Sequence, residues 1–169
     1  MYRRSFCLTP SRIAYIGDDY PQEWDIPTLD SVLMSVENSV HYAFNTSLSV
    51  LEWEATLPSS GGVLYLGDRD QPQRFTISMF HQLRCLNIIR DGLVSFRGTD
   101  KTAPSRLVTH CMQYLRQMVL CRSHLHLESV RNHVGPRITV SETTHRCRDW
   151  STVYEAAESN IRQNSEHNH

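Results

Sequence analysis

The sequence predicts a mainly α-helical domain of the α+β class with one small β-hairpin, and three observations lead to this prediction. Apolar residues recur at three- and four-residue steps in several segments, the pattern of about four or five helices that each bury one face. Two short β-prone runs lie on either side of a polar loop at residues 67–73. A chain of 169 residues with 40% hydrophobic residues suits one compact domain with a single core.

The domain is expected to span residues 28–163, between an arm and a tail. Residues 1–27 mix proline, aspartate and aromatic residues without periodicity, which predicts an extended arm that packs on the domain. Residues 164–169 are polar and rich in histidine and asparagine, which predicts a disordered tail.

The first predicted helix covers residues 28–44, because Thr28 is a suitable N-cap and an apolar stripe follows it. The stripe consists of Leu29, Val32, Leu33, Val36 and Val40. Proline, serine and glycine at residues 58–62 then end any regular element. The runs at residues 63–66 and 74–79 form the predicted hairpin, which needs helices packed against it.

Helical spacing returns at His81 and continues as an apolar stripe to Leu93. The next helix begins near Ser105 and runs to Cys121, and its many apolar positions predict a well-buried helix of about four turns. Residues 122–130 continue or resume this helix before a polar loop at 131–144, and residues 147–160 form the final helix.

Charge and hydropathy exclude several classes of partner. Seventeen Lys and Arg against eighteen Asp and Glu leave no positive excess for a phosphate backbone or an anionic lipid surface. No stretch approaches the roughly 20 apolar residues of a membrane span, and the first residues are too few for a signal peptide. Nucleic acid is therefore not an expected partner, and no membrane span is expected in this chain.

Two pairs of histidine and cysteine are candidates for chemistry. His81 and Cys85 lie four residues apart on one helix face, so both side chains could reach one metal ion or one substrate. The alternative is a capping or core histidine beside an ordinary buried cysteine, and spacing alone favours it. His110 and Cys111 point about 100° apart, so His110 is the better candidate for a polar cavity and Cys111 for the core or a disulfide.

The segments around these pairs resemble a known family. Residues 80–86 read Phe-His-Gln-Leu-Arg-Cys-Leu, and residues 110–117 read His-Cys-Met-Gln-Tyr-Leu-Arg-Gln. With landmarks at residues 16–21, 37–42, 61–62 and 147–150, the sequence resembles the fungal UstYa-like oxidases from about residue 15 to residue 160. That family is defined by two HxxHC motifs, and the resemblance implies an N-terminal membrane anchor ahead of the domain, which this chain would lack.

Both motifs depart from the family pattern. Arg84 stands where the first motif has its second histidine, and Leu107 stands where the second motif has its first. Of four motif histidines only His81 and His110 remain, so a metal site built from all four cannot exist here. His41 is a further candidate ligand because it lies on the predicted first helix, and His124 and His126 are weaker candidates.

The resemblance implies a tailoring enzyme of fungal secondary metabolism that oxidises or oxidatively cyclises a peptide or other natural-product intermediate. Copper is the implied metal, with His81, Cys85, His110 and His41 as candidate ligands and His81, Arg84 and His110 as candidate catalytic residues. The alternatives are a metal-independent cyclase that uses His81 and Arg84, and a non-catalytic accessory protein. A homo-oligomer, or a hetero-oligomer with a related family member, is a further expectation.

Cys121 and Cys147 are candidates for a disulfide in an oxidising compartment, although spacing does not decide connectivity. The compartment stays open: the secretory lumen if an anchor precedes the chain, and otherwise the cytoplasm.

Overall fold

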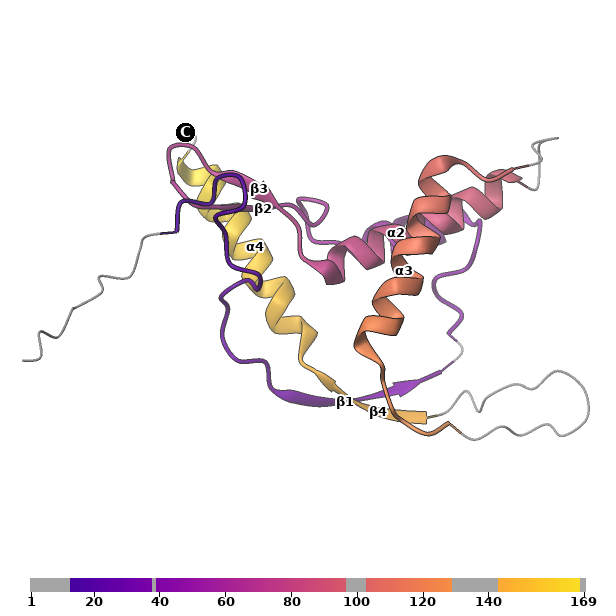
Figure 1. The fold of residues 1–169 in the computed structure, drawn as a ribbon. Coiled ribbons are helices and arrows are strands. Elements are labelled where there is room, and N and C mark those ends of the chain that lie inside the picture. Colours follow the sequence, from indigo (N-terminus) through magenta and orange to yellow (C-terminus); the bar gives the residue numbers. More distant parts are fainter. Residues whose placement is uncertain (1–12, 38, 97–102, 129–142, 168–169) are drawn as a thin grey trace, which may run out of the picture.

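The computed structural model describes residues 13–37, 39–96, 103–128 and 143–167. Its elements, in chain order, are β1 (Ser31–Val36), α1 (Ser47–Glu54), β2 (Leu64–Leu66), β3 (Gln73–Phe75), α2 (Ser78–Phe96), α3 (Arg106–Arg122), β4 (Thr143–Arg148) and α4 (Trp150–His167). Figure 1 shows α4 with the β2–β3 hairpin at one side, α2 with α3 at the other, and the β1–β4 ribbon between their lower ends. The predicted fold class, mainly helical with a small hairpin, is confirmed.

The predicted helix at residues 28–44 is wrong, because this segment contains β1. β1 pairs antiparallel with β4, with Ser31 opposite Arg148 and Val36 opposite Thr143. The backbone N–H of Asp149 extends the ladder by donating to the carbonyl oxygen of Asp30 at 2.8 Å. The valines of this segment suit a strand at least as well as a helix, and a partner more than 100 residues later decided between the two.

Helix α1 begins at a capping box formed by Thr46 and Ser49. The Thr46 hydroxyl accepts from the Ser49 backbone N–H at 3.0 Å, and the Ser49 hydroxyl accepts from the Thr46 N–H at 2.9 Å. The glycine turn predicted after this helix is present, and Gly62 has a φ of +84°. A Cβ on Gly62 would lie 2.8 Å from the Cβ of Phe80, so only glycine lets the turn rest on the start of α2.

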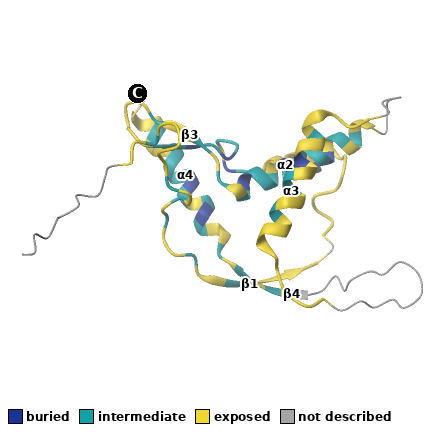
Figure 2. Cartoon of the chain, in the orientation of Figure 1, coloured by how far each residue is buried: buried dark blue, intermediate teal, exposed yellow. Residues whose placement is uncertain are grey.

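The core lies where β2, the first turn of α2, and α4 meet. Its buried apolar side chains are Leu64, Phe80, Val153 and Ala157. Figure 2 shows buried residues on α4, near the start of α2 and between α2 and α3, whereas large parts of the remaining surface are exposed. The core therefore joins the predicted hairpin to the final helix.

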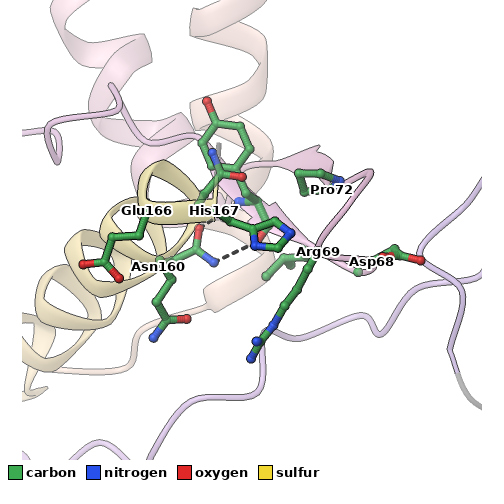
Figure 3. A pocket seen from close by; sticks show the side chains of 11 residues that line it. Asp68, Arg69, Pro72, Asn160, Glu166 and His167 are labelled. Atoms are coloured by element: carbon green, nitrogen blue, oxygen red, sulfur yellow. Dashed lines mark hydrogen bonds between the residues drawn. The ribbon is translucent and has the colours of Figure 1, made fainter. Parts of the chain in front are cut away.

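Hydrogen bonds from α4 fix it along β2. The Asn160 side chain accepts from the Tyr65 N–H at 2.8 Å and donates to the Tyr65 carbonyl at 2.7 Å. Beside this contact, a polar cavity of about 520 Å³ lies between the β2–β3 loop and the last turns of α4 (Figure 3). The final helix was predicted at residues 147–160. It begins later, at Trp150, because Cys147 belongs to β4, and it extends further, to His167.

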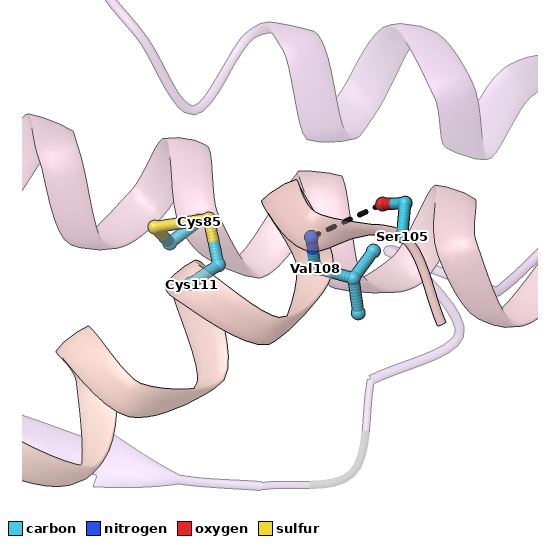
Figure 4. Close-up of a disulfide and its surroundings, with 4 residues drawn as sticks. All are labelled: Cys85, Ser105, Val108 and Cys111. Carbon is cyan, nitrogen blue, oxygen red and sulfur yellow. Dashed lines mark hydrogen bonds between the residues drawn. A yellow bond between two sulfur atoms is a disulfide. The ribbon is translucent and has the colours of Figure 1, made fainter. Parts of the chain in front are cut away.

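Helices α2 and α3 form an antiparallel pair. Ser105 caps α3 by accepting from the Val108 N–H at 3.2 Å (Figure 4), so the helix begins close to its predicted start near Ser105. A Cβ on Gly92 of α2 would lie 2.6 Å from Cγ2 of Val108, so this glycine permits the close approach of the two helices. No helix within the described ranges is long and apolar enough to cross a membrane.

The prediction that α3 is well buried is wrong. Cys111 is its buried residue, whereas Met112 is 55% exposed and Val119 is 72% exposed. The helix packs along one line on α2, so the edge of its apolar stripe at Met112 and Val119 faces solvent, whereas Val108, Leu115 and Met118 are half-buried. It ends at Ser123, which has a left-handed φ of +43°, and residues 123–128 have no regular structure rather than a continued helix.

Candidate functional site

A disulfide between Cys85 of α2 and Cys111 of α3 lies at the centre of the helix pair (Figure 4). Both cysteines are 1% exposed, and their Cα atoms lie 4.9 Å apart. The expectation that Cys111 belongs to the core or a disulfide is confirmed. Cys85 as a metal ligand is corrected, because a disulfide sulfur is no thiolate and metals bind the thiolate.

The predicted pairing of Cys121 with Cys147 is also corrected. Cys121 is exposed near the end of α3, Cys147 is partly buried in β4, and neither forms a disulfide within the described residues. The two helices bring residues 85 and 111 together instead, a juxtaposition that sequence spacing does not encode. Cys7 lies outside the described residues.

The two motif histidines lie on neighbouring faces of α2 and α3, and Tyr114 lies beside them. The ring centroid of His81 is 4.0 Å from that of Tyr114, with 22° between the planes. His110 lies 6.0 Å from His81 and 6.4 Å from Tyr114, again with nearly parallel planes. The three rings form one cluster, which we call the His81–His110–Tyr114 cluster.

The disulfide explains why this cluster forms. His81 lies one helical turn before Cys85 on the same side of α2, and His110 directly precedes Cys111 on α3. The covalent link between the cysteines therefore holds the two histidines near one another. Tyr114 lies one turn after His110, so the same helix face presents both rings to His81.

The environment of His81 favours its neutral form. Partial burial lowers the pKa of His81 below its usual value, and the nearby charges of His110 and Arg84 lower the pKa further. A neutral imidazole has a lone pair with which it can bind a metal ion or accept a proton. His81 is therefore prepared for either role near neutral pH.

Arg84 is anchored by the glycine turn. Its guanidinium donates a hydrogen bond to the carbonyl oxygen of Gly61. One turn beyond His81 on α2, it contributes a permanent positive charge on the same side of the helix. A guanidinium has five N–H donors, so the contact with Gly61 leaves donors for a substrate.

His41 is not brought to this cluster, which corrects its prediction as a ligand. The helix that was to carry His41 does not exist, and its Nδ1 atom lies 2.6 Å from Oε1 of Glu52. The same carboxylate accepts from the backbone N–H of Tyr42 at 2.7 Å, and these contacts lower the pKa of Glu52. His41 thus fastens the chain before α1.

His124 and His126 lie in a second group of rings, beyond the end of α3. Their ring centroids are 6.0 Å apart, and His145 of β4 lies 5.7 Å from His124 and 4.4 Å from His126. The Nε2 atom of His145 is 3.8 Å from a carboxylate oxygen of Glu128. His145 was not singled out in the sequence, because its neighbours come from a distant segment.

In the described part of the chain, the cluster offers copper two imidazole ligands. Imidazole nitrogens suit copper, and His81 and His110 supply two of them. No group of three or more His, Cys, Asp or Glu side chains in the described ranges is arranged to hold a metal ion. Within these ranges the chain offers two imidazoles and no third protein ligand beside them, and a site built from four motif histidines is excluded because two of the four are replaced in the sequence.

Comparison of the sequence with known proteins identifies a family and several similar proteins. It matches the family model described as mycotoxin biosynthesis protein UstYa over residues 22–160. It is 31% identical over 106 residues to the UstYa family oxidase phomYb of Diaporthe leptostromiformis, which covers 60% of this chain and 40% of that protein. It is likewise 31% identical over 111 residues to the oxidase ustYa of Aspergillus flavus, which covers 63% of this chain and 50% of that protein.

A third relative is the UstYa family oxidase phomYe of Diaporthe leptostromiformis, 29% identical over 89 residues, with 48% of this chain and 31% of that protein covered. The chain therefore spans half or less of the length of these relatives. No solved structure matches it.

Proposed function

Because the chain belongs to the UstYa family of mycotoxin biosynthesis proteins, we propose that it is a tailoring enzyme which oxidises or oxidatively cyclises a natural-product intermediate. The membership confirms the resemblance to this family, and the similar curated proteins are named oxidases. The observation that carries the proposal is the His81–His110–Tyr114 cluster at the crossing of α2 and α3. The intermediate is a peptide or another small natural product of fungal secondary metabolism.

His81 and His110 are the residues that would hold copper. Copper bound there would supply one-electron oxidation chemistry, with dioxygen as the electron acceptor. The buried disulfide between Cys85 and Cys111 keeps the two imidazoles from separating. The lowered pKa of His81 keeps its nitrogen unprotonated at neutral pH, because proton and metal compete for the same lone pair.

Tyr114 and Arg84 complete the site. Tyr114 covers one face of the His81 ring and partly shields it from water. Its phenol is the natural group to exchange a proton with a substrate that lies over the cluster. Arg84 provides charged hydrogen-bond donors to a carbonyl or carboxylate of the substrate from the neighbouring turn.

A metal-independent cyclase is the second candidate, and the proximity of Arg84 to His81 favours it. Here the neutral imidazole of His81 accepts a proton from the substrate, and the Arg84 guanidinium polarises a carbonyl. Burial, followed by the charges of His110 and Arg84, lowers the pKa of His81, so its imidazole is neutral at neutral pH, as such a base requires. This reaction needs neither copper nor an oxidant.

Metal analysis of the purified chain separates these candidates. Wild type, His81→Ala, His110→Ala and the matched control His41→Ala are loaded with copper, desalted and assayed for bound metal. We expect wild type and His41→Ala to retain copper and the two cluster variants to lose it. Retention in both cluster variants would refute the ligand assignment.

Conversion of the pathway intermediate, measured with and without dioxygen, then identifies the reaction. Activity that survives chelation and anaerobic conditions but is lost in Arg84→Gln would support the metal-free cyclase. Inactivity under every condition would leave a non-catalytic accessory role.

A further inference from the structure

An aromatic cavity of about 410 Å³ lies between the N-terminal arm, the hairpin and the start of α2. Tyr15 and Tyr20 of the arm and Phe75 of β3 form one wall. The Phe75 ring centroid lies 5.1 Å from that of Tyr20 and 6.0 Å from that of Tyr15. A volume in this range is typical of sites that bind small molecules or one end of a peptide.

Two arginines line the same cavity. Arg122 is the last residue of α3 and Arg148 is the last residue of β4, so two separate segments each contribute one arginine to this cavity. Neither guanidinium has a hydrogen-bond or ion-pair partner among the described residues. Glu23 also lines the cavity, which leaves a net charge of about +1 from these three side chains at neutral pH.

Uncommitted guanidinium groups beside an aromatic wall have a specific chemical complement. A guanidinium binds a carboxylate through charge-assisted, often paired hydrogen bonds, and an aromatic wall binds a flat apolar group. The cavity therefore complements a molecule that carries a carboxylate close to an aromatic or apolar side chain. The free C-terminal residue of a peptide has this arrangement when its side chain is aromatic.

We propose that this cavity is the substrate-anchoring site, where Arg122 and Arg148 bind the carboxylate of a peptide or amino-acid-derived intermediate and the aromatic wall binds its side chain. The identification of this ligand as the substrate rests on the function proposed above. Ser78 links the two sites: it lines the cavity and lies one turn before His81 on the same side of α2. The edge of the cavity at Ser78 therefore lies one turn of α2 away from the residue that begins the His81–His110–Tyr114 cluster.

Binding of N-acetyl-phenylalanyl-tyrosine and of its C-terminal amide tests this proposal by calorimetry on the metal-free chain. We expect the acid to bind about tenfold or more tightly than the amide, because a hydrogen bond to a charged group contributes about 1.5 kcal/mol or more. N-acetyl-glycyl-glycine, which has the carboxylate and no aromatic group, should bind more weakly than the tyrosine acid. Affinity for the acid should fall as salt is added.

Variants identify the groups responsible. Arg122→Gln and Arg148→Gln should each reduce affinity for the acid about tenfold and leave affinity for the amide unchanged. Arg106→Gln is the matched control, because it removes the same charge from the opposite end of α3. Glu23→Gln should strengthen binding of the acid. Thermal unfolding of each variant verifies that these surface changes leave the fold intact.

Equal binding of acid and amide, or equal binding by Arg122→Gln, Arg148→Gln and Arg106→Gln, would overturn the proposal. The assay uses the metal-free chain and involves no turnover, so its result does not depend on copper binding by His81 and His110. A failure of the copper assignment therefore leaves this result unaffected, and the reverse also holds.

Discussion

The ring of His81 stacks on the ring of Tyr114, with 4.0 Å between their centroids and 22° between their planes. This contact joins a residue of α2 to a residue of α3 and shields one face of the imidazole. Burial is the largest cause of the lowered pKa of His81, and the stacked ring of Tyr114 contributes to that burial.

Replacement of Tyr114 by alanine should raise the pKa of His81 towards its usual value. Tyr114→Phe preserves the stacked ring, so the pKa should stay low in that variant. NMR titration of the His81 ring protons measures the difference. If the phenol also exchanges a proton with substrate, Tyr114→Phe should lose activity while the pKa of His81 is unchanged. An equal pKa in the alanine variant and wild type would contradict the shielding role.

The stability of the chain should depend on pH through His81. Its pKa is lower in the folded state than in the unfolded state, so the unfolded chain binds the proton first as pH falls below about 6.5. His81 therefore contributes stability above this pH, and that stability is lost as pH falls through its folded pKa. Melting temperatures between pH 5 and pH 8 should fall more steeply in wild type than in His81→Gln. Parallel curves would show that His81 has no such linkage.

Loss of the disulfide should destabilise the chain substantially. The cysteines lie 26 positions apart in sequence, and a link across such a loop contributes about 3.5 kcal/mol in the chain-entropy description. The double variant Cys85→Ser with Cys111→Ser should therefore lower the free energy of unfolding in urea by about this amount. Cys121→Ser is the control, and it should have little effect because Cys121 is exposed and outside the disulfide.

The same double variant should also hold copper more weakly than wild type, because the link fixes the spacing of His81 and His110. Copper affinity that is unaffected by loss of the disulfide would show that the helices position these rings without it.

Gly62→Ala should be more destabilising than Gly17→Ala. Both glycines have a positive φ, so either alanine incurs about 1 kcal/mol of backbone strain. At Gly62 the added methyl group would also meet Phe80, whereas at Gly17 nothing lies within 4 Å. We expect about 1–3 kcal/mol of additional destabilisation at Gly62 from this overlap, measured by denaturant unfolding. Equal losses at the two positions would show that the turn can move away from Phe80.

The sequence by itself determined the elements and motifs whose signals are local. Ser105 and the stripe that follows it mark α3, the β-prone runs around residues 67–73 mark the hairpin, and the residues around His81 and His110 carry the family pattern. Caps, periodicity and turn residues act over a few positions, so they are legible without knowledge of the rest of the chain.

Only the tertiary structure decided which of these signals prevailed and which residues meet. Residues 31–36 have apolar spacing that a helix or a strand could use, and pairing with β4 made them a strand. The disulfide between Cys85 and Cys111 and the stacking of His81 on Tyr114 join separate elements. The cavity lined by Arg122 and Arg148 likewise draws on separate segments. Such contacts depend on how the elements pack against one another. The spacing of side chains along one helix shows which face is apolar, but it does not show which other helix or strand will cover that face.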